Sequence, residues 1–186
     1  MRGLSIMPVS PVPSPTEDEL LAFGTLLARS GKIIESEISG TSMGRTLSAG
    51  TRIRIQPLPA GDYGVGQIVA FVRGSTIFAH RMVYRTKQGV LTRGDNHSWC
   101  DLPMPVDAVL GLVTEWWING GWQRFAEVPQ GSPEQPWGIR VVETAVRAGM
   151  HMDIRLARRI SRALMRLARL RRNLRSEISP DGSVRP

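Results

Sequence analysis

Six short segments between residues 32 and 128 constrain the fold more than any other feature of the sequence. Each is rich in β-branched residues or alternates apolar with polar residues, and glycine, proline or aspartate separates one segment from the next. This pattern is typical of short strands joined by tight turns. The chain is therefore predicted to be mainly β, with a compact, mostly antiparallel domain over residues 32–128. The segments are KIIESEI, TRIRIQPL, GQIVAFVRG, STIFAHRMVYRT, GVLTRGD and AVLGLVTEWWI.

Helices are expected on both sides of this domain. Residues 1–31 combine a proline-rich leader, PVSPVPSP, with a short helix that ends near Gly31. Thr16 and Glu19 have the spacing of a capping box, in which each side chain accepts a hydrogen bond from the other residue's backbone N–H. Residues 129–150 are rich in proline and glycine at their start and are predicted to be a linker. Residues 151–178 are predicted to form a long amphipathic helix, followed by a disordered tail over residues 179–186.

The charge of the chain is concentrated in that last helix. Residues 151–186 contain ten arginines and hold +7 of the formal net charge of +8. A basic helix with one apolar side fits an anionic membrane surface, and a protein partner or the helix's own domain stays open as an alternative. No nucleic-acid-binding motif accompanies the charge, so no nucleic-acid partner is expected. The apolar side consists of Leu156, Ile160, Leu164, Leu167, Leu174 and Ile178.

The sequence gives little sign of a membrane-spanning or secretory segment. No stretch approaches the roughly 20 apolar residues that a helix needs to cross a bilayer. The prolines and acidic residues near the N-terminus do not suit the apolar core of a signal peptide. The expected location is cytoplasmic, with peripheral contact at the inner face of the membrane through residues 151–178.

Ser42, in the glycine-rich stretch SGTSMG, is a candidate nucleophile. A serine hydroxyl needs a base to remove its proton and donors to stabilise the oxyanion. His80 lies inside a predicted strand, which would give a base a fixed direction. Asp95 and Asp101 follow in TRGDNHSWCD, and either could hold the histidine tautomer, while the other would brace the loop. The alternatives are a turn serine and a half-buried strand histidine, which are the ordinary roles of these residue types.

Two other chemistries fit the sequence less well. Gly40 to Gly44 match G-x-S-x-G, the nucleophile elbow of α/β-hydrolases, but that motif requires a helix after the serine, and a strand is predicted there. His80 also precedes both aspartates, whereas that fold has its histidine last. The histidines and carboxylates show no metal-binding spacing, and Cys100 is the only cysteine, so neither a metal nor a cofactor is expected.

Four blocks, in this order and at these intervals, resemble the clan of serine peptidases that includes signal peptidase I and the SOS-repressor peptidases. They are SGTSMGRTLSAGTRIRI, GQIVAFVRG, IFAHRMVYR and TRGDNHSWCD followed by VLGLV, and they span roughly residues 34–114. The resemblance implies a signal-peptidase-like β domain. It also implies hydrolysis of a peptide bond through an acyl-enzyme, in a polypeptide bound as an extended strand.

The site residues carried by this resemblance are Ser42 as the nucleophile and His80 as the base. The histidine is similar to that of the archaeal, eukaryotic and sporulation signal peptidases, and Asp95 and Asp101 both coincide with acids that those enzymes use or require. Gly40, Thr41 and Met43 are expected beside the substrate and the oxyanion.

The chain departs from the family pattern at three points. Arg45 precedes Thr46 where the family usually has proline and threonine. Gly40 stands where some signal peptidases use a serine hydroxyl to stabilise the oxyanion, so backbone amides around Ser42 would have to contribute more. The membrane anchor usually found before the serine block has no counterpart in the sequence.

The sequence thus favours a serine endopeptidase that cleaves an extended leader or exported polypeptide. A self-cleaving regulator is disfavoured, because 31 residues before the β domain leave no room for a helix-turn-helix. The alternative from another class is a non-catalytic β module that binds peptides and uses the basic helix to reach a membrane or a partner.

Overall fold

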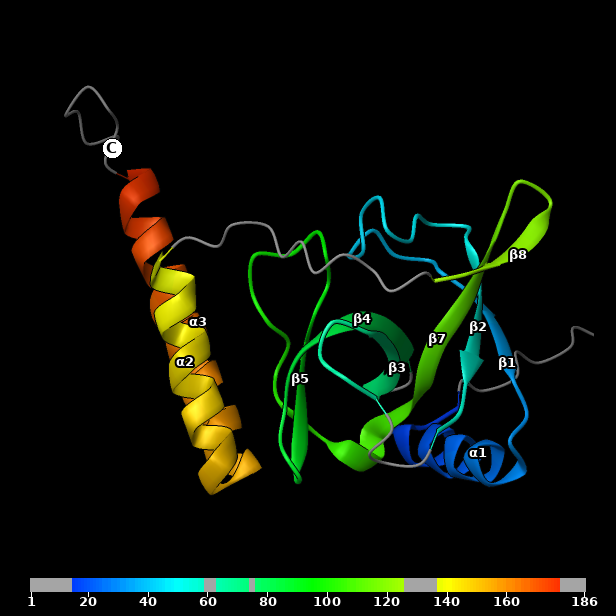
Figure 1. The fold of residues 1–186 in the computed structure, drawn as a ribbon. Coiled ribbons are helices and arrows are strands. Elements are labelled where there is room, and N and C mark those ends of the chain that lie inside the picture. The colour runs from blue at the N-terminus through cyan, green and yellow to red at the C-terminus, as the bar shows by residue number, and fades with distance from the viewer. Residues whose placement is uncertain (1–14, 59–62, 74–75, 126–136, 178–186) are drawn as a thin grey trace, which may run out of the picture.

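The computed structural model describes residues 15–58, 63–73, 76–125 and 137–177, and over these ranges the chain is mainly β. Eight strands form an antiparallel sheet in the order β1-β2-β7-β3-β4-β5-β6, and β8 pairs with β7 (Figure 1). The predicted fold class is confirmed. The strands are β1 (Ile34–Glu37), β2 (Arg52–Gln56), β3 (Ile68–Arg73), β4 (Thr76–Arg85), β5 (Gly89–Arg93), β6 (Met104–Pro105), β7 (Val109–Ile118) and β8 (Gly121–Arg124), with a 3-10 turn, η1, over Val106–Ala108.

β3 is a central strand, paired with β4 on one side and β7 on the other. Its sequence is apolar without alternation because both of its faces are covered, and every side chain from Ile68 to Val72 is buried. Ile68, Ala70 and Val72 belong to one hydrophobic cluster, and Val69 and Phe71 belong to a second. The turn that carries Ser42 and the strand that carries His80 are therefore built on a well-packed sheet.

The N-terminal helix α1 (Glu17–Ser30) packs against β7 and β3. The predicted capping box is present, since Thr16 N–H donates to the Glu19 carboxylate at 2.7 Å and Glu19 N–H donates to the Thr16 hydroxyl at 3.3 Å. Gly24 allows the close approach of the helix, because a Cβ there would lie 2.1 Å from Leu110 Cδ2. The short helix expected before Gly31 is confirmed.

The C-terminal region differs from the sequence-based expectation. Two helices, α2 (Trp137–Met152) and α3 (Ile154–Glu177), replace the expected linker over residues 129–150 and single helix over 151–178. The linker prediction is wrong from residue 137 onward, because Val142, Val146 and Met150 form a helical apolar stripe that packs on β5. Asp153 separates the two helices, and its carboxylate accepts a hydrogen bond from the Arg155 N–H at the start of α3.

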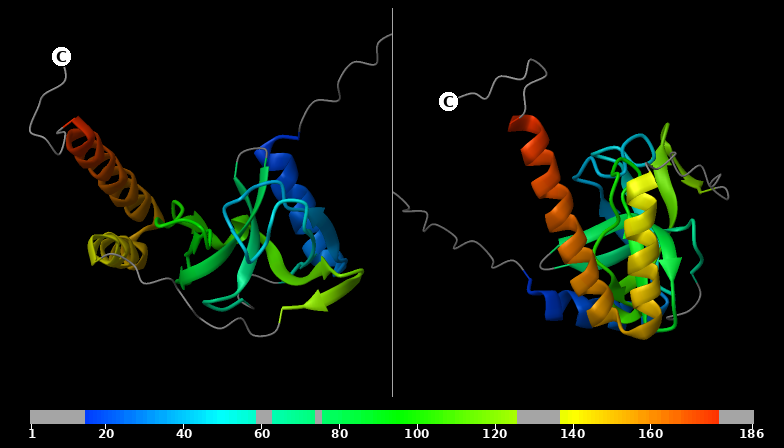
Figure 2. Two further views of the ribbon diagram at one scale, coloured as in Figure 1. Left: turned by 90° about the horizontal axis from the view of Figure 1, so that it is seen from above. Right: turned by 90° about the vertical axis from the view of Figure 1, so that its left-hand side faces the viewer.

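The helix pair lies side by side on one flank of the sheet, next to β5, and α1 lies on the opposite flank (Figures 1 and 2). The expected leader over residues 1–14 and the tail over 179–186 lie outside the described residues. Within the described part of the chain, no helix combines the length and the apolar character that crossing a membrane requires.

Candidate active site

Ser42 lies in a tight loop between β1 and β2. Two backbone hydrogen bonds close the base of this loop, from Ile38 N–H to the Thr51 carbonyl and from Gly50 N–H to the Ile38 carbonyl. A turn within it is closed by Gly44 N–H, which donates to the Thr41 carbonyl at 3.0 Å. Gly44 has a φ of +56°, a conformation that glycine adopts without the strain a Cβ would bring. The loop therefore has a defined shape that fixes the position of the serine.

Met43 and Leu47 anchor this loop in the core. Each is 1% exposed and belongs to the cluster that includes Ile53 and Ile55 of β2. The Met43 side chain thus packs inside the domain, so a role beside the substrate or the oxyanion would fall to its backbone. Because its neighbour is fixed in the core, Ser42 is held at the surface of the β domain, partly exposed.

His80 lies near the middle of β4 and is 2% exposed. Phe71 and Phe78 pack around its ring, with centroid distances of 5.7 and 6.0 Å. The Nε2 atom lies 2.9 Å from Ser42 Oγ, which is within hydrogen-bonding reach. The structure thus brings together the predicted nucleophile and the predicted base, which are 38 residues apart in the sequence.

Asp101, rather than Asp95, lies behind the histidine. Its Oδ2 atom is 2.6 Å from His80 Nδ1 and also accepts a hydrogen bond from the Thr92 hydroxyl at 2.7 Å. The Asp101 N–H donates to the Thr92 carbonyl at 2.8 Å, so the loop after β5 folds back on the strand at this residue. Ser42, His80 and Asp101 therefore form a continuous hydrogen-bonded triad.

Comparison of the sequence with protein-family models and with curated proteins gives no match. The chemistry open to this site follows from its geometry. A hydroxyl, an imidazole and a carboxylate in this order can activate the hydroxyl as a nucleophile, because the carboxylate holds the imidazole in the tautomer that accepts a proton at Nε2.

The electrostatics of Asp101 favour its ionised form. Burial tends to raise the pKa of this carboxyl, but the hydrogen bond and charge of His80, the hydrogen bond of Thr92 and the charge of Arg73 together hold the pKa below its usual value. Arg73 is about half exposed, lies 3.2 Å from Asp101 Oδ1 and stacks over the Phe78 ring at 4.3 Å. An ionised Asp101 is the state that supports an imidazolium.

Asp95 braces the loop instead. Arg81 donates to both of its carboxylate oxygens, at 2.9 and 2.6 Å, and the Thr46 hydroxyl donates at 2.6 Å. Burial acts to raise the pKa of Asp95, but these hydrogen bonds outweigh it and the pKa is lowered. Asp95 thus ties the β5 loop both to β4 and to the serine loop, while Arg45 remains exposed beside Thr46.

Gly94 and Asn96 complete the junction between the two loops. Asn96 N–H donates to the Ser42 carbonyl at 2.8 Å, and the Asn96 side-chain amide donates to the Thr41 carbonyl at 3.3 Å. A Cβ on Gly94 would lie 2.5 Å from the Ser42 carbonyl oxygen, so the close contact depends on glycine. This junction sets the distance between the nucleophile and the loop that carries Asp101.

Gly40 and Thr41 lie at the exposed edge of the serine loop. A Cβ on Gly40 would meet no atom within 4 Å, so this side of Ser42 is open. The N–H of Gly44 is used within the turn, which leaves the amides closer to Ser42 as the candidates for stabilising an oxyanion. Among the residues that the structure describes, no group of three or more histidine, cysteine or acidic side chains is arranged to hold a metal ion.

Sequence reasoning assigns no functional role to Thr92, Arg73 or His97. Thr92 supports Asp101, and Arg73 covers its outer oxygen. His97 is exposed, but its ring packs edge-on against His80 with centroids 5.9 Å apart. In the pairing of β5 with β4, Thr92 lies opposite Met82, two residues after His80 on β4. This register is the signal that could have identified Thr92 as a neighbour of the histidine.

Proposed function

We propose that this protein is a serine peptidase in which Ser42 is the nucleophile, His80 is the general base and Asp101 orients the histidine. The observation that carries this proposal is the triad itself, with the ring of a buried histidine bonded to the serine at 2.9 Å and to the aspartate at 2.6 Å. The order of the sequence blocks around these residues supports placing the chain in the signal-peptidase-like clan, as a divergent member.

In the proposed reaction, Ser42 Oγ attacks the carbonyl carbon of a peptide bond while His80 Nε2 takes its proton. Asp101 stabilises the imidazolium through Nδ1–H, and backbone amides beside Ser42 stabilise the oxyanion. The C–N bond then breaks, and the imidazolium gives its proton to the leaving amine. Water, deprotonated by His80, hydrolyses the acyl-enzyme and restores the serine. The open side at Gly40 gives an extended polypeptide room to approach the serine.

A peptide-library cleavage assay tests this function, because a library offers many different peptide bonds to the site at once. Ser42→Ala and His80→Ala should each lower kcat by about 10⁴-fold or more on the best peptide, since the members of a triad act as a unit. Ser98→Ala is the matched control, because Ser98 is exposed in the neighbouring loop. Cleavage that persists in either triad variant, or no cleavage of any peptide by the natural chain, would count against the assignment.

For location, we propose that the basic face of α3 holds the protein peripherally at the inner face of the membrane. Arg155, Arg159, Arg162 and Arg166 recur at three- and four-residue steps, and all four are exposed. Leu167, 61% exposed, lies beside this row and adds an apolar contact. An exposed basic row next to exposed apolar residues is the pattern of a helix at a bilayer interface.

This proposal is tested with charge substitutions, because deleting the helix would uncover the core beneath Ala157, which is 0% exposed. Arg159→Gln with Arg162→Gln should weaken binding to phosphatidylserine vesicles about 30-fold, since each basic residue contributes about 1 kcal/mol. Arg45→Gln with Lys87→Gln removes the same charge from exposed positions elsewhere and should have little effect. Binding is measured by flotation of the protein with the vesicles. Equal flotation of the α3 double variant and the control double variant would contradict membrane binding through α3.

A further inference from the structure

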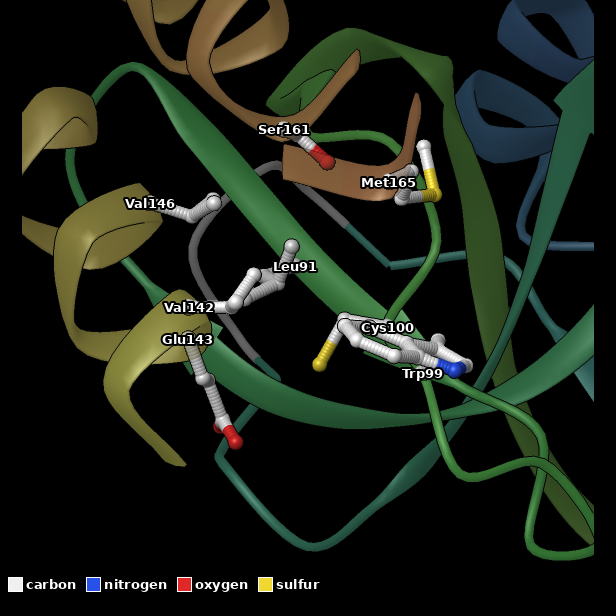
Figure 3. Close-up of a pocket in the computed structure, with 8 residues that line it drawn as sticks. All are labelled: Leu91, Trp99, Cys100, Val142, Glu143, Val146, Ser161 and Met165. Atoms are coloured by element: carbon white, nitrogen blue, oxygen red, sulfur yellow. The ribbon is translucent and has the colours of Figure 1, made fainter. Parts of the chain in front are cut away.

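The loop that carries Asp101 is held between two parts of the molecule. On one side, Asn96 is bonded to the backbone of the serine loop. On the other side, Trp99 and Cys100 face the helix pair across a small pocket (Figure 3). Asp101 directly follows Cys100, three residues before β6 begins at Met104. The position of Asp101 therefore depends on what lies against Trp99 and Cys100 as well as on the sheet.

The helix pair makes close, apolar contact with this region. Val146 and Met150 of α2 and Ala157 of α3 are each at most 3% exposed and form one cluster with Leu91 of β5. Cys100 packs against the same cluster. These residues cover the flank of the sheet next to the Asp101 loop, so the pair is part of the folded unit.

Polar contacts hold the pair in register. The Arg158 guanidinium of α3 donates to the Pro103 carbonyl at 2.8 Å, two residues after Asp101. Glu143 of α2, 9% exposed, lies 4.0 Å from the guanidinium of Arg93, which is 5% exposed. Glu143 also pairs with Arg147 on its own helix. A carboxylate buried at such an interface is unfavourable unless it is paired, so these contacts specify one docked position.

Arg93 connects the buried Glu143 to the surroundings of Asp101. It follows Thr92, whose hydroxyl and carbonyl both bond to Asp101. Cys100 lies directly before Asp101, and burial and the charge of Glu143 raise the pKa of its thiol to about 12, outweighing the interaction of the thiol with Arg93, which lowers that pKa. Glu143 thus pairs with Arg93, and Arg93 adjoins Thr92, which bonds to Asp101. Arg93 also interacts with Cys100, which directly precedes Asp101.

We propose that the helix pair positions Asp101, the acid that orients His80, and that Glu143 is the positioning residue, acting on Asp101 through Arg93. The inference rests on the proposed function, because it concerns the same triad. The inference gives α2 and α3 a role in the triad that is separate from the membrane contact proposed for the basic face of α3. The helices hold the loop after β5 in the conformation that keeps Asp101 against His80.

Two measurements test this without requiring activity. Glu143→Gln and Arg158→Gln should each raise the rate of maleimide labelling at Cys100, the lone cysteine, by about tenfold or more under native conditions, because the loop and helix separate more often. Arg158→Gln is the deciding variant, because it leaves in place the charge of Glu143 that raises the thiol pKa. The NMR signal of the His80 Nδ1 proton shared with Asp101 should shift or broaden in both variants. Arg140→Gln, which removes one charge from the exposed face of the helix that carries Glu143, should change neither signal.

The kinetic test separates positioning from a purely structural role. On the best peptide from the library, Glu143→Gln should lower kcat about tenfold and leave KM within about twofold, because orientation of the base matters in the transition state. Arg158→Gln removes the hydrogen bond to the Pro103 carbonyl and should also lower kcat. Arg158 is partly exposed, so this substitution should leave the protein folded.

The outcomes distinguish the two proposals. Unchanged labelling, an unchanged Nδ1 signal and unchanged kcat in both Glu143→Gln and Arg158→Gln would overturn the positioning role. If the natural chain cleaves no peptide but Arg158→Gln still raises Cys100 labelling, the peptidase function is overturned and the docking contact stands.

Discussion

Replacing Asp101 by asparagine isolates the contribution of its charge to catalysis. The amide oxygen can take the place of Oδ2, where His80 Nδ1 and the Thr92 hydroxyl both donate, and the amide nitrogen then faces Arg73, whose half-exposed side chain can move away. The substitution is therefore compatible with the fold. What it removes is the negative charge that stabilises the imidazolium in the transition state.

The size of the effect follows from the geometry. Two unit charges about 4 Å apart interact by about 4 kcal/mol at the effective dielectric constant of about 20 that suits partly buried sites. The 2.6 Å contact between Nδ1 and Oδ2 brings the charges of His80 and Asp101 within this range. A loss of about 4 kcal/mol corresponds to about a 10³-fold decrease in kcat. If the amide flips and forces the other histidine tautomer, the loss should approach about 10⁴-fold.

Asp95→Asn is the matched comparison, because the same change is made on the same loop. It weakens the bidentate pair with Arg81 and the hydrogen bond from Thr46, so it should lower the free energy of unfolding by about 2 kcal/mol. Its effect on kcat should stay within about tenfold. Peptide cleavage and thermal unfolding of both variants provide the measurement. A larger loss of kcat in Asp95→Asn than in Asp101→Asn would refute the assignment of the orienting acid.

Three further results are expected. Gly94→Ala should lower kcat about 10²-fold with the fold retained, because the new Cβ would displace the Ser42 carbonyl, and misplacement of a reacting group by about 1 Å has an effect of this size. Gly40→Ser has room for its side chain and should raise kcat several-fold by adding a donor near the oxyanion; a decrease would indicate that the oxyanion forms elsewhere. The lowered pKa values of Asp95 and Asp101 mean that both stabilise the fold fully above about pH 4, so urea unfolding should show stability decreasing as the pH falls below that value, and less steeply in Asp95→Asn.

The sequence is most informative where local pattern and tertiary structure agree. The strands of the sheet follow β-branched segments, and Ser42 and His80 lie in elements whose form the local sequence determines: a glycine-rich turn and an alternating strand. The choice between Asp95 and Asp101 could not be made in this way. Both lie on one irregular loop, and only the return of that loop onto Thr92 directs Asp101 toward the histidine.

The sequence-based prediction misses two elements, β8 and α2, for different reasons. β8 forms a hairpin with β7 through Asn119 and Gly120, which both have positive φ values, and this Asn-Gly pair is a strong hairpin signal that is present in the sequence. The helix α2 is absent from the prediction because the proline and glycine at the start of residues 129–150 suggest a linker for the whole segment. The apolar stripe of α2 is explained by the tertiary structure, in which Leu91 of β5 covers it.

The location of Ser42, His80 and Asp101 in the fold explains why the helix pair matters. Ser42 is fixed by a turn that is anchored in the core and bonded to Asn96, and His80 by the middle of a strand, so neither is in contact with the helix pair through these supports. Asp101 follows a loop of irregular backbone, whose end can move unless other elements hold it. The sheet supplies the contacts of Asp101 with Thr92, His80 and Arg73, and the helices supply the cover over Cys100. Weakening the contact between the helix pair and the loop, as in Arg158→Gln, should therefore displace Asp101 from His80 before it disturbs the hydrogen bond between Ser42 and His80.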